Sequence, residues 1–338
     1  MKVGIVGYGI AGRYFHAPAL VSAGFEIAAI CTRSMERKEV AHSDFPAAVM
    51  VNSIEEILDE DLDLIVIAST NEVHVEHARA SLHRGIPTVV DKPVALNYAD
   101  TASLFDLSES LNVPLVAFFN RLWDSDSLTV KKVISDGSIG NVFRVESRYE
   151  RFRPEINPNS WRETLTSDHG GGLLLDLQTH LISTALDLFG DAKLVFSSLK
   201  EVRGASEDDV VLILQHESGV DSYLSVSSII GAPGPRLRVR GDQGTLIIND
   251  LDHQESHLRK GFIPQPGQWL PSAEITTEAR IHKGDNSFNY PGVPGAYPAF
   301  YESMRGVINT GSIPPISPEL ALNVARLIDE ARELNIKS

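Results

Sequence analysis

The order of apolar and polar residues divides the chain into two parts. Over residues 1–120, short apolar runs alternate with amphipathic stretches, and the runs are KVGIV, EIAAIC, LDLIVIAS, TVV and LVAFF. Continuous apolar runs are typical of strands that are covered on both faces, and helices between such strands imply a parallel sheet. The first part therefore predicts an α/β domain with a doubly wound parallel sheet.

After residue 120 the period of the pattern changes. VFRVESRYE alternates apolar and polar positions, as a strand with one polar face does, and residues 193–250 hold further alternating segments. Residues 173–189 have the pattern of a helix, whereas residues 261–298 are rich in proline and glycine and predict a loop. We therefore expect an α+β domain with a largely antiparallel open sheet over residues 121–338. Its final helix, over residues 318–334, can pack back across the domain boundary.

Composition excludes several classes of partner. The chain has 338 residues and a formal net charge of −15, which disfavours nucleic acid and anionic membranes because both attract basic surfaces. The single cysteine, Cys31, rules out a disulfide within the chain and a multi-cysteine metal site. No apolar run approaches the ~18 residues of a membrane-spanning helix, and the first strand begins too early to leave room for a leader. We expect a cytoplasmic protein with a small-molecule partner and no metal.

The segment GYGIAG follows the first predicted strand and precedes a helix. Gly7, Gly9 and Gly12 have the spacing that permits a tight turn, a close approach of the backbone to a pyrophosphate, and close helix–strand packing. Ile10 and Ala11 lie at the helix N-terminus, where free N–H groups attract phosphate. Glycines also form ordinary turns, but in this strand–helix context they predict a dinucleotide site.

Thr32-Arg33-Ser34 ends the next strand, about twenty residues further on, where an acidic residue often binds the ribose hydroxyls of NAD. Thr32 removes the repulsion that an acid would exert on a 2′-phosphate, and the guanidinium of Arg33 suits phosphate. The segment favours NADP over NAD. The alternative is that Arg33 is a solvated arginine stacked on adenine, or that both cofactors bind.

Two further segments carry candidate catalytic groups. DKP places Lys92 just past a strand end, where it can polarise a substrate oxygen, although a surface lysine in a turn is the commoner case. Asp176 and His180 lie four residues apart on a helix, so that they share a face, and a histidine there can accept a hydroxyl proton. The alternative is an acid in the first helical turn and a buried structural histidine. The run Gly170–Gly172 leaves space beside the helix start for a ligand or backbone.

Two histidine-containing segments are weaker candidates. His74 and His77 superficially suggest metal ligation, but they lack the spacing of the zinc-protease motif and read better as helix-surface or cofactor-edge residues. Asp168 and His169 adjoin the glycine run, yet neighbouring side chains on a loop need not face one site.

Taken together, these motifs resemble the Gfo/Idh/MocA family of NAD(P)-dependent oxidoreductases over essentially the whole chain. ASTNEVHVEHA stands where the family has ATPNxxHxxxA, DKPVA stands for EKPxA, and FFNR stands for FNR. GGGLLLDLQTHLISTALDLFG stands for GGGxLxDxGxHxxDxxxxLxG. YFHAPAL, NRLWDSDSLTVKKVIS, RFRPEINPNSWRE and PGAYPAFYESM are most similar to the NADP-dependent scyllo-inositol dehydrogenase branch.

The resemblance implies a Rossmann domain over residues 1–120 and a role for each candidate. Lys92 would contact both substrate and nicotinamide, with a cis peptide bond before Pro93, while Asp176 would bind a substrate hydroxyl and His180 would transfer the proton. Further residues are expected around these three. Ser69, Asn71 and His74 would line the nicotinamide ribose, and Asn120, Arg153, Trp161 and Tyr297 would contact the substrate.

The sequence departs from the family pattern at three positions. Asp91 replaces the usual glutamate, Thr70 replaces a proline, and Gln178 stands where glycine is usual, beside the expected pocket, so that substrate shape can differ. The expected function is an NADP(H)-dependent oxidoreductase that acts on a secondary alcohol or ketone of a cyclic polyol or sugar. The alternatives are a non-catalytic NADP-binding sensor and a family enzyme that uses NAD and another sugar. The resemblance also implies a homodimer or homotetramer that forms through the sheet of the second domain.

Overall fold

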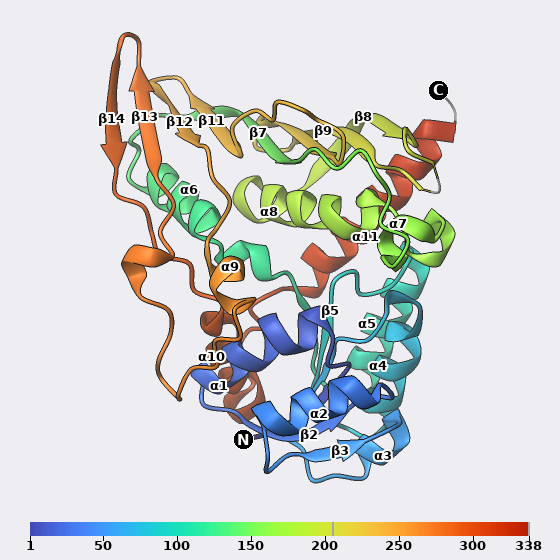
Figure 1. The fold of residues 1–338 in the computed structure, drawn as a ribbon. Coiled ribbons are helices and arrows are strands. Elements are labelled where there is room, and N and C mark those ends of the chain that lie inside the picture. Colours follow the sequence, from blue (N-terminus) through green and yellow to red (C-terminus); the bar gives the residue numbers. More distant parts are fainter. Residues whose placement is uncertain (205, 337–338) are drawn as a thin grey trace.

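The computed structural model describes residues 1–204 and 206–336 and contains two β-sheets with helices between and around them (Figure 1). The first sheet has six parallel strands in the order β3-β2-β1-β4-β5-β6. Its strands are β1 (Lys2–Val6), β2 (Glu26–Cys31), β3 (Val49–Val51), β4 (Leu64–Ile67), β5 (Thr88–Asp91) and β6 (Leu115–Phe118). The predicted doubly wound parallel sheet is confirmed.

The strand order reverses between β1 and β4, and this reversal positions the cofactor site. Right-handed connections place the helices before and after the reversal on opposite faces of the sheet, leaving a crevice at the carboxyl ends of β1 and β4. The connecting helices are η1 (Ala11–His16), α1 (Ala17–Ser22), α2 (Met35–Asp44), α3 (Ile54–Leu58), η2 (Asn71–Val73), α4 (His74–His83) and α5 (Tyr98–Leu111).

The second sheet has eight strands in the order β14-β13-β12-β11-β7-β10-β9-β8. All neighbouring pairs are antiparallel except β7 with β10, so the predicted largely antiparallel sheet is confirmed. Its strands are β7 (Val142–Glu150), β8 (Ala192–Lys200), β9 (Asp209–His216), β10 (Asp221–Ser227), β11 (Leu237–Gly241), β12 (Gly244–Ile248), β13 (Ala279–Lys283) and β14 (Asn286–Tyr290).

Within the described residues, helices cover one face of this second sheet, and Figure 1 shows α6 and α8 on that face, between the two sheets. Alternate residues of β7, β9 and β10 are buried, as the period-two pattern requires. The helices of this part of the chain that precede α10 are η3 (Asn120–Trp123), α6 (Ser125–Ser135), α7 (Trp161–Thr164), η4 (Ser167–His169), η5 (Leu174–Gln178), α8 (Thr179–Phe189) and α9 (Gln254–Leu258).

The last two helices connect both parts of the molecule. In α10 (Pro298–Thr310), Arg305 Nη1 donates to the carbonyl of Ala23 at 2.8 Å. In α11 (Pro318–Ile336), Arg332 Nη1 donates to the carbonyl of Leu96 at 2.9 Å, while other α11 residues contact β8. The final helix therefore packs back onto the first part of the chain.

The predicted loop over residues 261–298 is wrong in part. It contains η6 (Ser272–Glu274) and the hairpin β13–β14, which adds two strands to the edge of the second sheet. Only alternate residues of β13 are buried and four of the five β14 residues are exposed, so the apolar pattern is too sparse to reveal them. No helix within the described residues is both long and apolar enough to cross a lipid bilayer.

Candidate active site

The glycine loop after β1 has the shape of a phosphate cradle. Gly7 has φ +99°, and a Cβ on Gly7 or Gly12 would run into the backbone of Ala68 or of Gly7 itself. A Cβ on Gly9 would meet only the guanidinium of Arg37, whose Nη1 lies 3.7 Å away. The loop is thus tightly packed at its first and third glycines and open, beside a cation, at its second. This arrangement fits a dinucleotide pyrophosphate.

The helix that follows begins with the π-helical turn η1, whose N-cap is Ile10. The first N–H groups of a helix have no acceptor within it, so those around Ile10 and Ala11 are available to an anion. Ile10 is 46% exposed, which leaves this end of the helix accessible.

Thr32, Arg33 and Ser34, the segment predicted to select the cofactor, have different surroundings at the end of β2. Thr32 is buried and its N–H donates to Val51, whereas Arg33 is exposed and no side-chain partner holds it among the described residues. Ser34 caps α2, because its Oγ accepts the N–H of Arg37 at 3.3 Å. Arg37, on the first turn of α2, faces the glycine loop and was not predicted. Its position four residues after Arg33 at a helix start is the sequence signal for it.

Lys92 and Asp176 form the central contact between the two parts of the molecule. Lys92 Nζ donates to Asp176 Oδ1 at 2.9 Å and to the Asp176 carbonyl at 2.5 Å. Arg162 Nε donates to the same Oδ1 at 3.1 Å. The Lys92–Pro93 peptide bond is cis, as the resemblance implies. The structure therefore brings two of the three predicted catalytic residues together and adds Arg162, which the sequence did not reveal.

The carboxyl group of Asp176 is held ionised. Burial raises its pKa, but the charges of Lys92 and Arg162 and the hydrogen bond from Lys92 outweigh burial, so that its pKa lies well below the usual range. Asp176 belongs to η5, a second π-helical turn, which leads directly into α8.

His180 lies one turn further along, near the start of α8. It is 5% exposed, and its Nδ1 is buried without a hydrogen-bond partner among the described residues. The Tyr149 ring meets the imidazole edge-on at a centroid distance of 6.3 Å. Burial, followed by the charges of Lys92 and Arg121, lowers the pKa of His180 well below its ordinary value, while Asp176 opposes this. The histidine is therefore neutral at physiological pH, and Asp176 acts on it through charge, without a hydrogen bond in the described structure.

The residues expected near the nicotinamide ribose cluster around one buried histidine. His74 is 1% exposed, its Nδ1 lies 2.8 Å from the carbonyl of Pro93, and its Nε2 lies 3.1 Å from the carbonyl of Ser69. Ser69 Oγ contacts His77 Nδ1 at 3.1 Å, and Asn71 is nearly buried at the start of η2. His74 thus links the end of β4 to the Lys92–Pro93 turn, and neither of its nitrogens is free for a metal.

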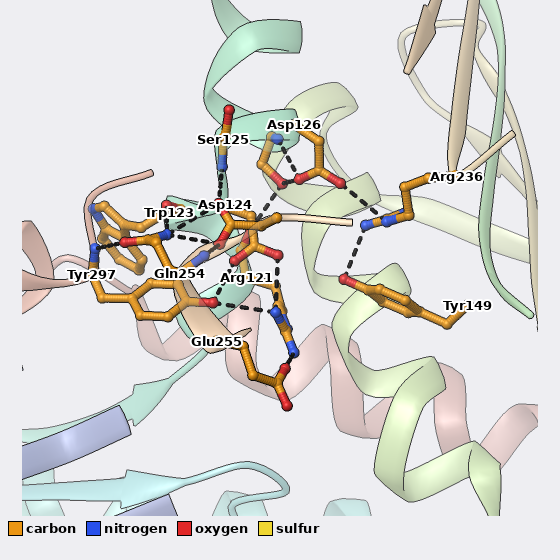
Figure 2. Close-up of polar contacts among 12 residues, drawn as sticks. Arg121, Trp123, Asp124, Ser125, Asp126, Tyr149, Arg236, Gln254, Glu255 and Tyr297 are labelled. Atoms are coloured by element: carbon orange, nitrogen blue, oxygen red, sulfur yellow. Dashed lines mark hydrogen bonds and ion pairs between the residues drawn. The ribbon is translucent and has the colours of Figure 1, made fainter. Parts of the chain in front are cut away.

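Tyr297 lies in a buried polar network (Figure 2). Its Oη donates to Asp124 Oδ1 at 2.7 Å and accepts from Arg121 Nη1 at 3.2 Å, while Arg121 Nη2 also bonds Glu255. Tyr297 is fully buried, and the neighbouring Asn120 is 6% exposed. The structure therefore gives Tyr297 protein partners. Arg121, Asp124 and Glu255 were not predicted because their pairing depends on contacts up to 176 residues apart.

The network extends to His180 through a second arginine. Arg236 forms a 3.0 Å ion pair with Asp126 and donates to Tyr149 Oη at 3.0 Å (Figure 2). Its guanidinium carbon lies 4.1 Å from the centre of the Tyr149 ring, which in turn faces His180. Buried cations thus surround the candidate base without bonding to it.

The remaining predicted residues differ in position. Arg153 is exposed and its carbonyl accepts from Arg203 at 2.8 Å, while Trp161 is half-buried beneath the guanidinium of Arg162. Gln178 was expected beside the pocket, and this is wrong. It is fully buried and its Nε2 points to the carbonyl of Leu224 in β10 at 3.5 Å, because it lies on the sheet-facing side of the helix.

Backbone and a carboxylate occupy the space beside the glycine run. A Cβ on Gly171 would meet the carbonyl of Leu165, and one on Gly172 would meet the carboxylate of Glu207. The exposed His169 pairs with Glu72 at 3.5 Å and takes no part in the Lys92–Asp176 contact. The glycines therefore allow residues 160–170 to pack against the start of the helix that carries Asp176 and His180.

The fold and this site define a dinucleotide-binding oxidoreductase. Residues 1–119 match the oxidoreductase family with an NAD-binding Rossmann fold, and residues 127–247 match the GFO/IDH/MocA C-terminal domain. The chain belongs to the Gfo/Idh/MocA family of oxidoreductases.

Individual relatives extend over nearly the whole chain. The chain is 33% identical to scyllo-inositol 2-dehydrogenase (NADP(+)) IolW of Bacillus subtilis, over 98% of this chain and 93% of that protein. It is 32% identical to the oxidoreductase YdgJ of Escherichia coli, over 100% and 96% respectively. The solved structure of the YPO2259 protein from Yersinia pestis is similar with a TM-score of 0.88 and 31% identity, covering 100% of this chain and 95% of that chain.

Proposed function

We propose that this protein is an NADP(H)-dependent oxidoreductase that transfers a hydride between nicotinamide and a secondary alcohol or ketone of a cyclic polyol or sugar, of the scyllo-inositol/inosose type. The observation that carries the proposal is the Lys92–Asp176 ion pair with His180 one turn beyond it. These three groups supply a cation for an oxyanion, an acceptor for a hydroxyl and a neutral base within one small region.

The residues that would hold the cofactor are those of the glycine loop and of the β2 end. The loop N–H groups would bind the pyrophosphate, and Arg33 and Arg37 would bind the 2′-phosphate. When bound, NADP(H) supplies or accepts the hydride. The name of IolW specifies NADP(+), which supports the same preference here. NAD is the alternative if Arg33 only stacks on adenine.

Side chains of the protein transfer the proton and stabilise the charge on the substrate oxygen. In the oxidative direction, His180 accepts the hydroxyl proton at Nε2, because Nδ1 is enclosed. Lys92 uses two of its N–H groups on Asp176, so its third remains for the substrate oxygen, where its charge stabilises developing negative charge. Asp176 orients the substrate by accepting a hydrogen bond from a hydroxyl. In the reductive direction, the same groups act in reverse.

A non-catalytic sensor of the same fold is the second candidate. A sensor needs only the glycine loop, whereas this chain retains Lys92, Asp176 and His180 in contact or on adjacent turns, which favours turnover. The test is an initial-rate screen of NADPH with inososes and of NADP with inositols and sugars, followed by NADPH absorbance. Turnover of one of these substrates supports the enzyme; tight NADPH binding without any turnover would favour the sensor.

The proposal includes a cytoplasmic location and a homodimer or homotetramer formed through the uncovered face of the second sheet. On that face, Phe196 in β8 is 45% exposed and lies opposite Ile213, which alternates with the buried residues of β9. Exposed apolar side chains that are grouped in this way mark an association surface. Light scattering of the purified protein tests the assembly, and a monomer at micromolar concentration would contradict it.

A further inference from the structure

Arg162 is attached through both its backbone and its side chain to the segment Gly172–Asp176, where the helix that carries Asp176 and His180 begins. Its carbonyl accepts the N–H of Gly172 at 3.0 Å, and its Nε donates to Asp176 Oδ1 at 3.1 Å. The glycine run makes this possible, because a side chain at Gly172 would displace Glu207 and with it the packed loop. The guanidinium is therefore fixed beside the Asp176 carboxylate.

Exposure rises from the inside of this cluster outward. The side chain of Lys92 is 12% exposed, that of Asp176 is 18% exposed and that of Arg162 is 37% exposed. Arg162 is therefore the more accessible of the two cations that bond Asp176. The guanidinium carbon lies 4.3 Å from the centre of the Trp161 ring, which supports one face of the group and leaves its edge available.

Both members of the Arg162–Asp176 pair have hydrogen-bonding groups without a partner among the described residues. Lys92 and Arg162 both bond Oδ1, and among the described residues no side chain donates to Asp176 Oδ2. The Nη groups of Arg162 likewise have no acceptor among those residues. A free carboxylate oxygen beside free guanidinium N–H groups matches a hydroxyl, which can donate to the first and accept from the second.

We propose that Arg162, together with Asp176, binds the hydroxyl on the carbon next to the reacting carbon, so that the enzyme selects vicinal diols and α-hydroxy ketones. This inference rests on the proposed function, in which Lys92 binds the reacting oxygen. Lys92 and Arg162 bond the same carboxylate oxygen, which places them close enough together to bind oxygens on adjacent carbons of one substrate. Arg162 is thus a specificity-determining residue.

We expect the site to reject strongly an analogue that lacks this hydroxyl, because the groups that would bind it are charged and partly buried. A site built to hydrogen-bond a hydroxyl rejects the analogue that lacks it by up to roughly 10⁴-fold, since its polar groups are then left unpaired. A purely structural Arg162 would only hold Asp176 in place. Its removal would then lower turnover of every substrate by the same factor and leave the discrimination unchanged.

The experiment compares wild type, Arg162→Gln and Arg162→Lys. Each is assayed with NADP(H) on the best substrate of the screen and on the analogue that lacks both hydroxyls flanking the reacting carbon. We expect wild type to favour the full substrate by at least about a hundredfold in kcat/KM. Arg162→Gln should reduce this ratio to below about tenfold, mainly by raising KM, and Arg162→Lys should restore part of it. Binding of NADPH should be unchanged in both variants.

Arg84→Gln is the matched control, because Arg84 pairs with Asp59 on the surface of the first domain. It should keep the wild-type ratio. An Arg162→Gln enzyme that keeps the wild-type ratio, whatever its absolute activity, would overturn the inference and leave the proposed function standing. A wild-type enzyme that turns over no substrate of the screen would remove the proposed function, and the inference with it.

Discussion

Lys92 Nζ lies 2.9 Å from Asp176 Oδ1, joining two residues that are 84 positions apart in the chain. Lys92 follows β5 of the first sheet, and Asp176 lies in the helix that packs under the second sheet. The contact therefore places Lys92, the cation expected to stabilise a substrate oxyanion, against Asp176, the carboxylate expected to orient the substrate. The two residues come from different domains. Formation of the site depends on how the two parts pack together.

Replacing Lys92 by methionine should abolish most turnover and also change its pH dependence. The charge of Lys92 lowers the pKa of His180, so its removal raises that pKa. Since the base must be neutral, the acid limb of the oxidation rate should then move to higher pH. Residual rates measured between pH 5 and pH 9 test this. Lys193→Met, at an exposed position in β8, is the control, and an acid limb that stays in place would contradict the electrostatic role.

Cofactor preference should change when the end of β2 is altered. Thr32→Asp combined with Arg33→Ala adds a charge that repels a 2′-phosphate and removes a cation that attracts it. A charge-assisted hydrogen bond contributes ~1.5–3 kcal/mol, so the ratio of kcat/KM for NADPH over NADH should fall by roughly ten- to a hundredfold. Adding Arg37→Ala should lower it further. A double variant that keeps the wild-type ratio would show that this segment does not select the cofactor.

Tyr297→Phe distinguishes a structural from a substrate-binding tyrosine. Its Oη donates to Asp124, a buried carboxyl whose pKa is raised mainly by burial, and accepts from Arg121. Loss of that hydroxyl leaves buried polar groups unpaired and should cost ~1–3 kcal/mol of the free energy of unfolding. Denaturant unfolding should detect this loss while KM changes by less than about twofold. A large rise in KM at unchanged stability would instead support the substrate contact that the resemblance implies.

Stability should decrease below pH 6.5, in part because of His16. This residue is fully buried against Phe118, and burial lowers its pKa to about 4. The unfolded chain binds the proton below pH ~6.5 whereas the folded chain does so only near pH 4, so the stabilisation present at pH 7 is lost as pH falls. From pH 7 to pH 5, wild type should lose about 2 kcal/mol more than His16→Gln. Equal losses in urea titrations would contradict this.

Local patterns predicted the elements on which the candidate residues lie. Lys92, Asp176 and His180 could be named as candidates because each lies in a short motif at the end of a strand or on a helix. Arg162, Arg37 and Arg121 were not found, since a surface arginine and an arginine beside the site look alike until the chain is folded. Gln178 shows the opposite error, since it was expected beside the pocket but packs against the second sheet. Helical spacing alone does not distinguish the side of a helix that faces a sheet from the side that faces a ligand.

The short edge strands show a similar limit. β3 has only three residues, β13 is buried only at alternate positions and β14 is largely exposed, so none of them has the continuous apolar run by which the four-residue strands β4, β5 and β6 could be recognised. Their existence follows from the strands that pair with them. β3 pairs with β2, while β13 pairs with β12 on one side and, across a tight turn, with β14 on the other.

The most direct test of the central claim is the initial rate of His180→Ala with NADP(H) and the best polyol or sugar substrate, measured beside its affinity for NADPH. The account predicts that turnover falls by at least about a hundredfold, as expected for loss of a general base, while the Kd for NADPH stays within about twofold of wild type. Wild-type turnover in His180→Ala would contradict the assignment of this histidine as the proton acceptor.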